Sequence, residues 1–322
     1  MPNYIPDDTI PQALYAAIIQ SQIEYGQELK EFLRGQPITD MPISVTSLIG
    51  APQRKILSSR HHHEMYVDPV KDLWPSFMGN CIHLVLENQA KKNPDYLVEF
   101  RMGMVITVDG KKFLVHGKLD LYSHSEQALE DWKITRPTSI LYDKTDHIMQ
   151  LNVLRMILKA NGYPVKNMTD VYMFPHLDNT KVGKIEGYPT RNATMIQAPS
   201  LPDKDVMEYI YERVKKHWKN KDLDDEDLDE CTDAERWIRG STFKVYFRKK
   251  GKGVQDFSSK AAHYFTDKVE LEKWAVDHDT ADGEEYEVKE YKGSPKACDY
   301  CDSRPFCNQW REEHSVAKPL FG

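Results

Sequence analysis

The stretch VHGKLDLYSHSEQALEDWKIT, residues 115–135, is central to the interpretation of this chain. Its first half is an apolar run that leads to Asp120, and its second half leads to Asp131 and Lys133. Residues two apart in a strand point to the same face, so Asp131 and Lys133 should lie side by side, and a neighbouring strand can place Asp120 opposite them. Two carboxylates beside a lysine predict a divalent-cation site in which an ammonium group offsets negative charge.

A hairpin turn orders the strands around this stretch. Residues 96–108 and 112–123 are both rich in apolar and β-branched residues, and Asp109-Gly110 between them favours a two-residue turn. Residues 125–135 supply a third strand, so the two aspartates should share one sheet. The alternative interpretation of the D-x-K tripeptide is a surface salt bridge on an edge strand, since such tripeptides are common by chance.

Helical patterns flank these strands. GNCIHLVLENQAKK at 79–92 has apolar residues at helical spacing, and its His83 and Glu87 are interpreted on spacing alone as a surface pair. DHIMQLNVLRMILKA at 146–160 is amphipathic and carries Gln150 beside its apolar face. Further upstream, ISVTSLIGAPQRKIL at 43–57 predicts a short strand followed by a turn and a basic segment.

Three cysteines near the end of the chain form a C-x2-C-x5-C pattern: Cys298, Cys301 and Cys307. Thiolates select zinc or iron–sulfur, and four ligands are usual for either group. The fourth ligand must come from far away in the sequence, and Cys231 is the most exposed candidate by sequence context. Cys81 lies in an apolar helix and is interpreted as a small buried residue. Three unrelated thiols are the alternative.

Composition indicates an ordinary globular protein. The chain has 322 residues, of which 40% are hydrophobic and 29% charged. No stretch approaches the roughly 18 uninterrupted apolar residues of a membrane span, and MPNYIPDDTIPQ at the start does not resemble a signal peptide. We therefore expect a cytoplasmic protein without a membrane partner, whose five cysteines are thiols or metal ligands rather than disulfides.

The net charge of −7 argues against a general nucleic-acid coat. It does not exclude an enzyme acting on nucleic acid, because local patches govern phosphate contacts and residues 243–253, FKVYFRKKGKG, are basic.

Together, these motifs resemble the RecB-like branch of the PD-(D/E)XK nucleases, which includes the CRISPR-associated RecB-like exonucleases. That branch has a helical Gly-x-x-x-His, a strand Asp preceded by Gly, a D/E-x-K strand, and a helix carrying Gln. The corresponding positions in this sequence are Gly79 to His83, Gly117 to Asp120, Asp131-Trp132-Lys133, and Gln150. The resemblance covers residues 79–160 and extends through the cysteines to residue 307.

The resemblance implies an α/β fold: a restriction-endonuclease-like core with a central mixed β-sheet flanked by helices, plus a cysteine-stapled C-terminal extension. The implied organisation has an N-terminal helical accessory segment at 1–78 and a nuclease core at 79–220. Residues 221–322 would form the C-terminal extension, with its metal- or iron–sulfur-binding cysteines packed on the core.

Site roles also follow from the resemblance. It implies four ligands for Mg2+ or Mn2+: His83, Asp120, Asp131 and the backbone carbonyl of Ile134. Lys133 would position or activate the attacking water and offset charge in the transition state. Gln150 would contact the DNA backbone or steady the site.

The cysteine ligands are implied through a phage-type variant of the pattern. Iron–sulfur members usually have a first cysteine in a segment similar to SLIGAPQRK, where this chain has Ala51. Phage-encoded members look similar through a Cys-Thr-x-x-Glu-Arg-Trp stretch, matched here by residues 231–237. The implied ligands of a [4Fe-4S] cluster, or alternatively of Zn2+, are therefore Cys231, Cys298, Cys301 and Cys307. Such a cluster pins the tail and does not perform cleavage.

The implied function is that of a metal-dependent DNA nuclease, an exonuclease in recombination, replication or repair, acting on single-stranded or duplex ends. Two alternatives stand beside it: a non-catalytic DNA-binding or assembly module with a structural zinc or iron–sulfur site, and a zinc-binding adaptor. The sequence has no G-x-x-x-x-G-K-[ST] motif, so any ATP-driven unwinding would come from a helicase or recombination partner protein.

Overall fold

The computed structural model divides the chain into two compact units, Met1–Asp229 and Glu230–Gly322, which we describe separately. The residues it describes are 2–7, 9–142, 144–238, 240–248, 257, 260–279, 285–291 and 293–315. Residues 249–253 of the basic stretch therefore lie outside the described ranges. The predicted segment limits at residues 78 and 220 stay predictions.

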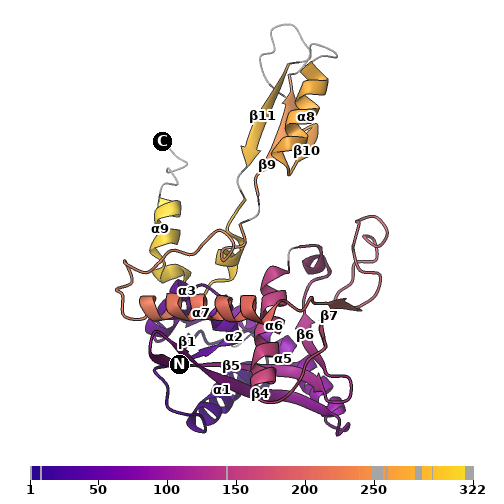
Figure 1. Cartoon of the computed structure of the whole chain (residues 1–322). Coiled ribbons are helices and arrows are strands. Elements are labelled where there is room, and N and C mark those ends of the chain that lie inside the picture. The colour runs from indigo at the N-terminus through magenta and orange to yellow at the C-terminus, as the bar shows by residue number, and fades with distance from the viewer. Residues whose placement is uncertain are drawn as a thin grey trace. The chain divides into compact units, whose positions relative to one another are not determined.

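The first unit is built on a six-stranded mixed sheet between layers of helices (Figure 1). In spatial order its strands are β2 (Met41–Ser44), β5 (Lys111–Ser123), β6 (Ala128–Ile134), β7 (Asn167–Met173) and β8 (Ala193–Gln197), with β4 (Tyr96–Val108) paired to β5. β2 is parallel to β5 and β6 is parallel to β7, whereas the other pairs are antiparallel. The predicted α/β class is confirmed, and the sheet is consistent with a restriction-endonuclease-like core.

The hairpin of β4 and β5 is the longest pairing in this sheet. Asp109 and Gly110 adopt φ values of 49° and 76°, as a two-residue turn of this kind requires, and the predicted turn is confirmed. On the other edge of β5, β2 pairs with residues 113–116 and β6 pairs with residues 121–123. Residues 117–120 lie between these two pairings, where β5 and β6 diverge. We call this place the fork and define it as residues 117–120 of β5 and 131–133 of β6.

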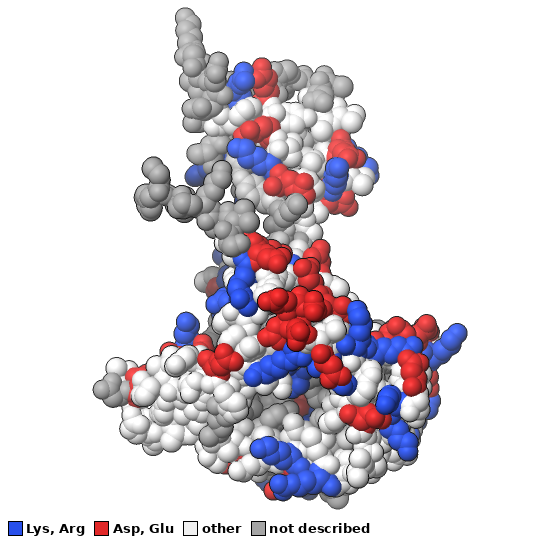
Figure 2. Space-filling model, turned by 90° about the vertical axis from the view of Figure 1, so that its left-hand side faces the viewer, with Lys and Arg blue, Asp and Glu red and all other residues white. Residues whose placement is uncertain are grey.

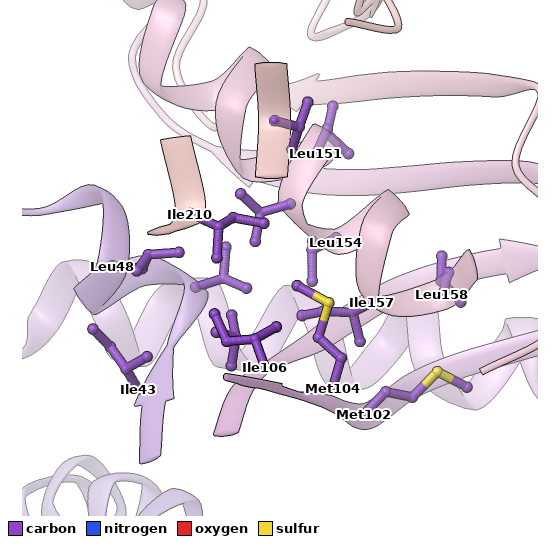
Figure 3. Close-up of a cluster of buried hydrophobic side chains, with 14 of the residues drawn as sticks. Ile43, Leu48, Met102, Met104, Ile106, Leu151, Leu154, Ile157, Leu158 and Ile210 are labelled. Carbon is purple, nitrogen blue, oxygen red and sulfur yellow. The ribbon is translucent and has the colours of Figure 1, made fainter. Parts of the chain in front are cut away.

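The main hydrophobic core lies between the sheet and one layer of helices. This layer contains α2 (Val45–Ile49), α6 (Thr145–Ala160) and α7 (Asp203–Asn220). Its buried side chains, drawn in Figure 3, include Ile43, Leu48, Met104, Leu154 and Ile210. Gly117 permits close packing here, because a Cβ atom at this position would lie 2.5 Å from Leu154 Cδ2 and 3.0 Å from Val45 Cγ2. The glycine therefore lets α6 lie directly against the fork.

The opposite face of the sheet is covered by α5 (Trp74–Ala90), which begins earlier than the predicted start at Gly79. Leu86 of α5 packs against Val98, Leu121 and Trp132. The N-terminal helix α1 (Gln12–Arg34) contacts α5. The remaining elements of this unit are β1 (Asn3–Tyr4), β3 (Tyr66–Val67), α3 (Pro52–Arg60), α4 (Pro69–Asp72) and the 3-10 turn η1 (Pro137–Leu141).

The short strand predicted to begin at residue 43 ends at Ser44, and α2 and α3 occupy residues 45–49 and 52–60, with Gly50 and Ala51 between them. Ser44 starts α2 by accepting a hydrogen bond from the Ser47 backbone N–H at 3.2 Å. At the other end, Arg213 of α7 donates to the carbonyls of Leu48 and Ile49 at 2.8 and 3.2 Å. A distant guanidinium thus satisfies carbonyls that a short helix leaves without partners.

The second unit has a small antiparallel sheet and a cysteine-containing segment. Its elements are β9 (Thr242–Phe247), β10 (His263–Phe265), α8 (Lys268–Asp279), β11 (Tyr286–Tyr291), the 3-10 turns η2 (Lys296–Tyr300) and η3 (Arg304–Phe306), and α9 (Asn308–Ser315). Among its described residues, the buried hydrophobic side chains are Val245 and Leu271. In the described part of the whole chain, every helix is too short or too polar to cross a membrane.

Candidate active site

The fork brings the predicted aspartates together. Leu121 pairs with Glu130, so the next step of the same antiparallel register aligns Asp120 with Asp131. The strands separate at this step, and the backbone N–H of Trp132 donates to Asp120 Oδ2 at 2.5 Å instead of completing the ladder. The Asp120 carboxylate consequently lies in the gap between the two strands.

Asp131, Lys133 and Gln150 form a closed set of contacts, which we call the Asp131 triangle. Lys133 Nζ lies 2.5 Å from Asp131 Oδ2 and donates to Gln150 Oε1 at 2.9 Å. Gln150 Nε2, from α6, donates to Asp131 Oδ1 at 2.8 Å. Asp131 is only 5% exposed and β6 lies between β5 and β7, so the alternative of a surface pair on an edge strand is wrong. The triangle holds the Lys133 ammonium in one place.

A second group of donor atoms lies on the α5 side of the fork. His83 Nδ1 is 2.7 Å from Glu99 Oε1 and 3.6 Å from Asp120 Oδ1. One ligand atom from each of these three residues lies within 4.8 Å of the others, a grouping that could hold a metal ion. The surface pairing expected between His83 and Glu87 is wrong, because the Glu87 carboxylate contacts Lys91 at 2.5 Å.

Glu99 is a site residue that the sequence analysis missed. The pairs on either side of it, Val98 with Leu121 and Phe100 with Leu119, place it opposite Asp120. Its φ of 50° is in the left-handed region, which is unusual for a residue with a side chain. Val98 and Met102 are four residues apart and would share one face of a regular strand. Val98 instead packs against α5 and Met102 belongs to the core beneath α6, so the alternation of side chains shifts at Glu99. The only sequence signal is a carboxylate inside an apolar strand.

The two carboxylates Glu99 and Asp120 have pKa values shifted in opposite directions. Burial alone would raise the pKa of Glu99, but hydrogen bonds from His83 and Lys118 bring it below its ordinary value. Lys118 Nζ lies 2.8 Å from Glu99 Oε2 and 3.2 Å from Glu28 Oε2 of α1. Burial and then the charge of Asp131 raise the pKa of Asp120 well above its ordinary value. A cation next to Asp120 would favour its ionised form.

Asp170 is a further buried carboxylate that the sequence analysis missed. The parallel register of β6 and β7 places it beside Asp131, and it is 3% exposed. Burial raises its pKa to about 6, although nearby Lys133 opposes that shift. Its Oδ2 accepts a hydrogen bond from Tyr172 at 3.4 Å, and the Tyr172 hydroxyl lies 2.8 Å from His147 Nδ1. Asp170 therefore adds negative charge behind the Asp131 triangle.

One backbone carbonyl also lies at the fork. The Trp132 carbonyl oxygen is 3.2 Å from His83 Nε2, two residues before the predicted ligand Ile134. Ile134 is paired with Met173 of β7. The role predicted for the Ile134 carbonyl stays a prediction.

The four predicted cysteine ligands all belong to the second unit: Cys231, Cys298, Cys301 and Cys307. Burial, Glu235 and then the other three thiols raise the pKa of Cys231 to about 12, so the thiols are near enough to interact electrostatically. Arg236 hydrogen-bonds to Cys298. Burial raises the pKa of Cys307, and hydrogen bonds from the backbone N–H groups of residues 309 and 310 oppose that shift. Cys81 is exposed on α5, so its interpretation as a buried residue is wrong.

Comparison with known proteins gives remote likenesses. No protein-family model and no curated protein matches the chain. The crystal structure of SSO0001 is similar over 61% of this chain and 86% of that chain, with 18% identity and a TM-score of 0.43. A phage related exonuclease from Haemophilus somnus 129PT is similar over 45% of this chain and 69% of that chain, with 14% identity and a TM-score of 0.29. Likenesses this remote do not define a family.

Proposed function

We propose that this protein is a Mg2+- or Mn2+-dependent DNA nuclease that hydrolyses phosphodiester bonds. The observation that carries this proposal is the fork, where a His-Glu-Asp group lies beside a lysine held by the Asp131 triangle. Hard divalent cations take carboxylate oxygens as ligands, and a phosphodiester that is being hydrolysed gains negative charge. The fork combines both requirements in a partly buried setting.

The proposed metal ligands come from both diverging strands and from α5. Asp120 and Glu99 would supply carboxylate oxygens, His83 an imidazole nitrogen, and Trp132 its backbone carbonyl, which already lies beside the imidazole. When bound, the cation would neutralise phosphoryl oxygens and lower the pKa of a water molecule. Asp131 and the Ile134 carbonyl are further candidate ligands.

The reaction adds water across a P–O ester bond. The water oxygen forms a bond to phosphorus, the ester P–O bond breaks, and one water proton ends on the leaving oxygen. Lys133 would place its ammonium against the phosphoryl oxygens and orient the attacking water. Asp131 and Gln150 would keep that ammonium in position throughout, because each of them contacts it and they also contact each other.

We further propose that the four cysteines of the second unit hold a [4Fe-4S] cluster, with Zn2+ as the alternative. Arg236 donates to Cys298, and two backbone N–H groups donate to Cys307 and oppose the rise in pKa that burial causes there. Such donors stabilise thiolates, the form in which cysteine binds a metal. The cluster would join residues 231 and 298–307, which are far apart in the sequence, and would take no part in cleavage.

The surface charge favours contacts with DNA at particular places. On the face shown in Figure 2, lysine and arginine side chains are interspersed with aspartate and glutamate. On this face, a strand of DNA would be held by local basic groups rather than by one continuous basic surface. We propose that the enzyme acts as an exonuclease on DNA ends in recombination, replication or repair, with a helicase or recombination protein as partner.

The function is tested by a time course on end-labelled single-stranded and duplex DNA. We expect cleavage with Mg2+ or Mn2+ and none in EDTA, and the product ladder should shorten progressively from one end. A folded protein that binds DNA but leaves both substrates intact with either metal would instead be a non-catalytic binding module. Cleavage that continues unchanged in EDTA would contradict the metal requirement.

Glu99→Gln should weaken Mn2+ binding by about tenfold or more, because the change removes a charged oxygen ligand while keeping the size of the side chain. Titration calorimetry on the full chain measures this affinity without any cleavage assay. Glu87→Gln is the matched control, since Glu87 is a carboxylate of α5 that pairs with Lys91. Equal Mn2+ affinities for the two variants would show that Glu99 is not a metal ligand.

A further inference from the structure

The small sheet of the second unit has two faces of different character. Its strands pair in the order β10-β9-β11. One face packs against α8, whose Trp274 ring lies 5.0 Å from His263, 5.7 Å from Phe265 and 5.2 Å from Tyr286, measured between centroids. Val245 is fully buried on this face. The apolar core of the sheet is therefore on the α8 side.

The opposite face carries tyrosines and lysines. Side chains alternate along β9, so Lys244 and Tyr246 point away from the Val245 side. The register places Tyr264 and Lys289 on either side of Lys244, and places Tyr291 opposite Thr242. We call this surface the tyrosine face and define it by five residues: Lys244, Tyr246, Tyr264, Lys289 and Tyr291.

The rings and ammonium groups of the tyrosine face are close together. Lys244 Nζ lies 4.4 Å from the Tyr291 ring centroid and 5.7 Å from that of Tyr264. Lys289 Nζ lies 5.3 Å from the Tyr246 ring centroid. Tyr264 is 63% exposed and Tyr291 is 43% exposed. Large aromatic side chains are thus presented to solvent in contact with cations.

This combination matches the chemistry of a single nucleic-acid strand. Unpaired bases stack on aromatic rings, and the backbone phosphates bind ammonium groups. Among the described strand residues in register on this face, the two lysines outnumber the carboxylate of Glu287, which lies 2.8 Å from Lys289. In a duplex the bases already stack on one another and offer no free ring faces, so the surface suits a single strand.

We propose that the tyrosine face binds single-stranded DNA, with bases stacked on Tyr264 and Tyr291 and phosphates near Lys244 and Lys289. The choice of DNA rests on the proposed nuclease function, but the surface itself contains no residue of the fork. Binding by the tyrosine face and cleavage at the fork can therefore be measured separately.

The test uses the full chain without added Mg2+ or Mn2+ and a fluorescent oligothymidylate of about 15 nucleotides, followed by anisotropy. Tyr264→Leu and Tyr291→Leu should each weaken binding about tenfold or more, because leucine is apolar but has no ring on which a base stacks. Tyr264→Phe keeps the ring and should bind within about twofold of the wild type. Lys244→Gln should lower the slope of log affinity against log salt by about 0.7.

Tyr66→Leu is the matched control, because Tyr66 is 76% exposed but belongs to β3 of the first unit. Circular dichroism of each variant checks that the fold is kept. The proposal is overturned if Tyr264→Leu and Tyr66→Leu bind equally well, or if a duplex of the same length binds more tightly than the single strand. If binding depends on the tyrosines but no cleavage occurs with Mg2+ or Mn2+, the proposed nuclease activity is contradicted. The proposal that the tyrosine face binds single-stranded DNA is then still supported.

Discussion

Replacing Asp131 with alanine should lower the rate of DNA cleavage by about 10³-fold, with Mg2+ or Mn2+ in excess. Asp131 contacts both Lys133 and Gln150, at 2.5 and 2.8 Å. Without its carboxylate, the Lys133 ammonium loses its counter-charge and the Asp131 triangle loses two of its three contacts. We expect the loss mainly in kcat, since Lys133 acts on charge that develops during the reaction.

Stability has to be separated from catalysis in this experiment. Asp131 is buried, and its removal leaves a half-buried lysine without a counter-ion, which destabilises the fold. Asp131→Asn is therefore measured alongside, because it keeps the volume and an oxygen that can accept from Gln150. Both variants should keep the affinity for single-stranded DNA. An alanine variant that is folded and cleaves within about threefold of the wild type would remove Asp131 from the reaction.

Replacing Cys301 with serine should remove the bound metal of the second unit and destabilise that unit. We expect the wild type, purified without oxygen, to be brown and to contain about four iron atoms per chain. The variant should be colourless and should be cleaved by proteases within residues 230–322 much faster than the wild type. The expected effect is large because the described residues of this unit bury only Val245 and Leu271 as hydrophobic side chains.

Cys81→Ser is the matched control, because Cys81 is exposed on α5 in the first unit. It should keep the colour, the iron content and the protease resistance of the wild type. A colourless wild type that contains one zinc per chain would show that the cysteines bind zinc and not an iron–sulfur cluster. A wild type without stoichiometric iron or zinc would contradict a metal site of either kind.

Local sequence patterns were sufficient for several features of this protein. Asp109-Gly110 predicts the hairpin because few other dipeptides adopt two positive φ values. The i, i+2 spacing predicts the contact between Asp131 and Lys133, since it follows from the period of a strand alone. Helical periodicity likewise predicts α6 and most of α5. Each of these predictions depends on residues close together in the chain.

Other features depend on contacts that no local pattern contains. Val45 and Thr46 are β-branched, but Ser44 caps the helix that they begin and Arg213 closes it from 165 residues away. Glu99 reaches His83 only because the β4–β5 register places it opposite Asp120 and its own φ is positive.

By itself, the sequence determined the α/β class, the hairpin and the positions of Asp120, Asp131 and Lys133 on neighbouring strands. The tertiary structure decided that β5 and β6 diverge at the fork, that Glu99 joins His83 and Asp120, and that Asp170 lies behind Asp131. The physical reason is the range of the interactions. Strand period and turn geometry are set within a few residues, whereas strand order, register and helix packing depend on burial shared by distant segments.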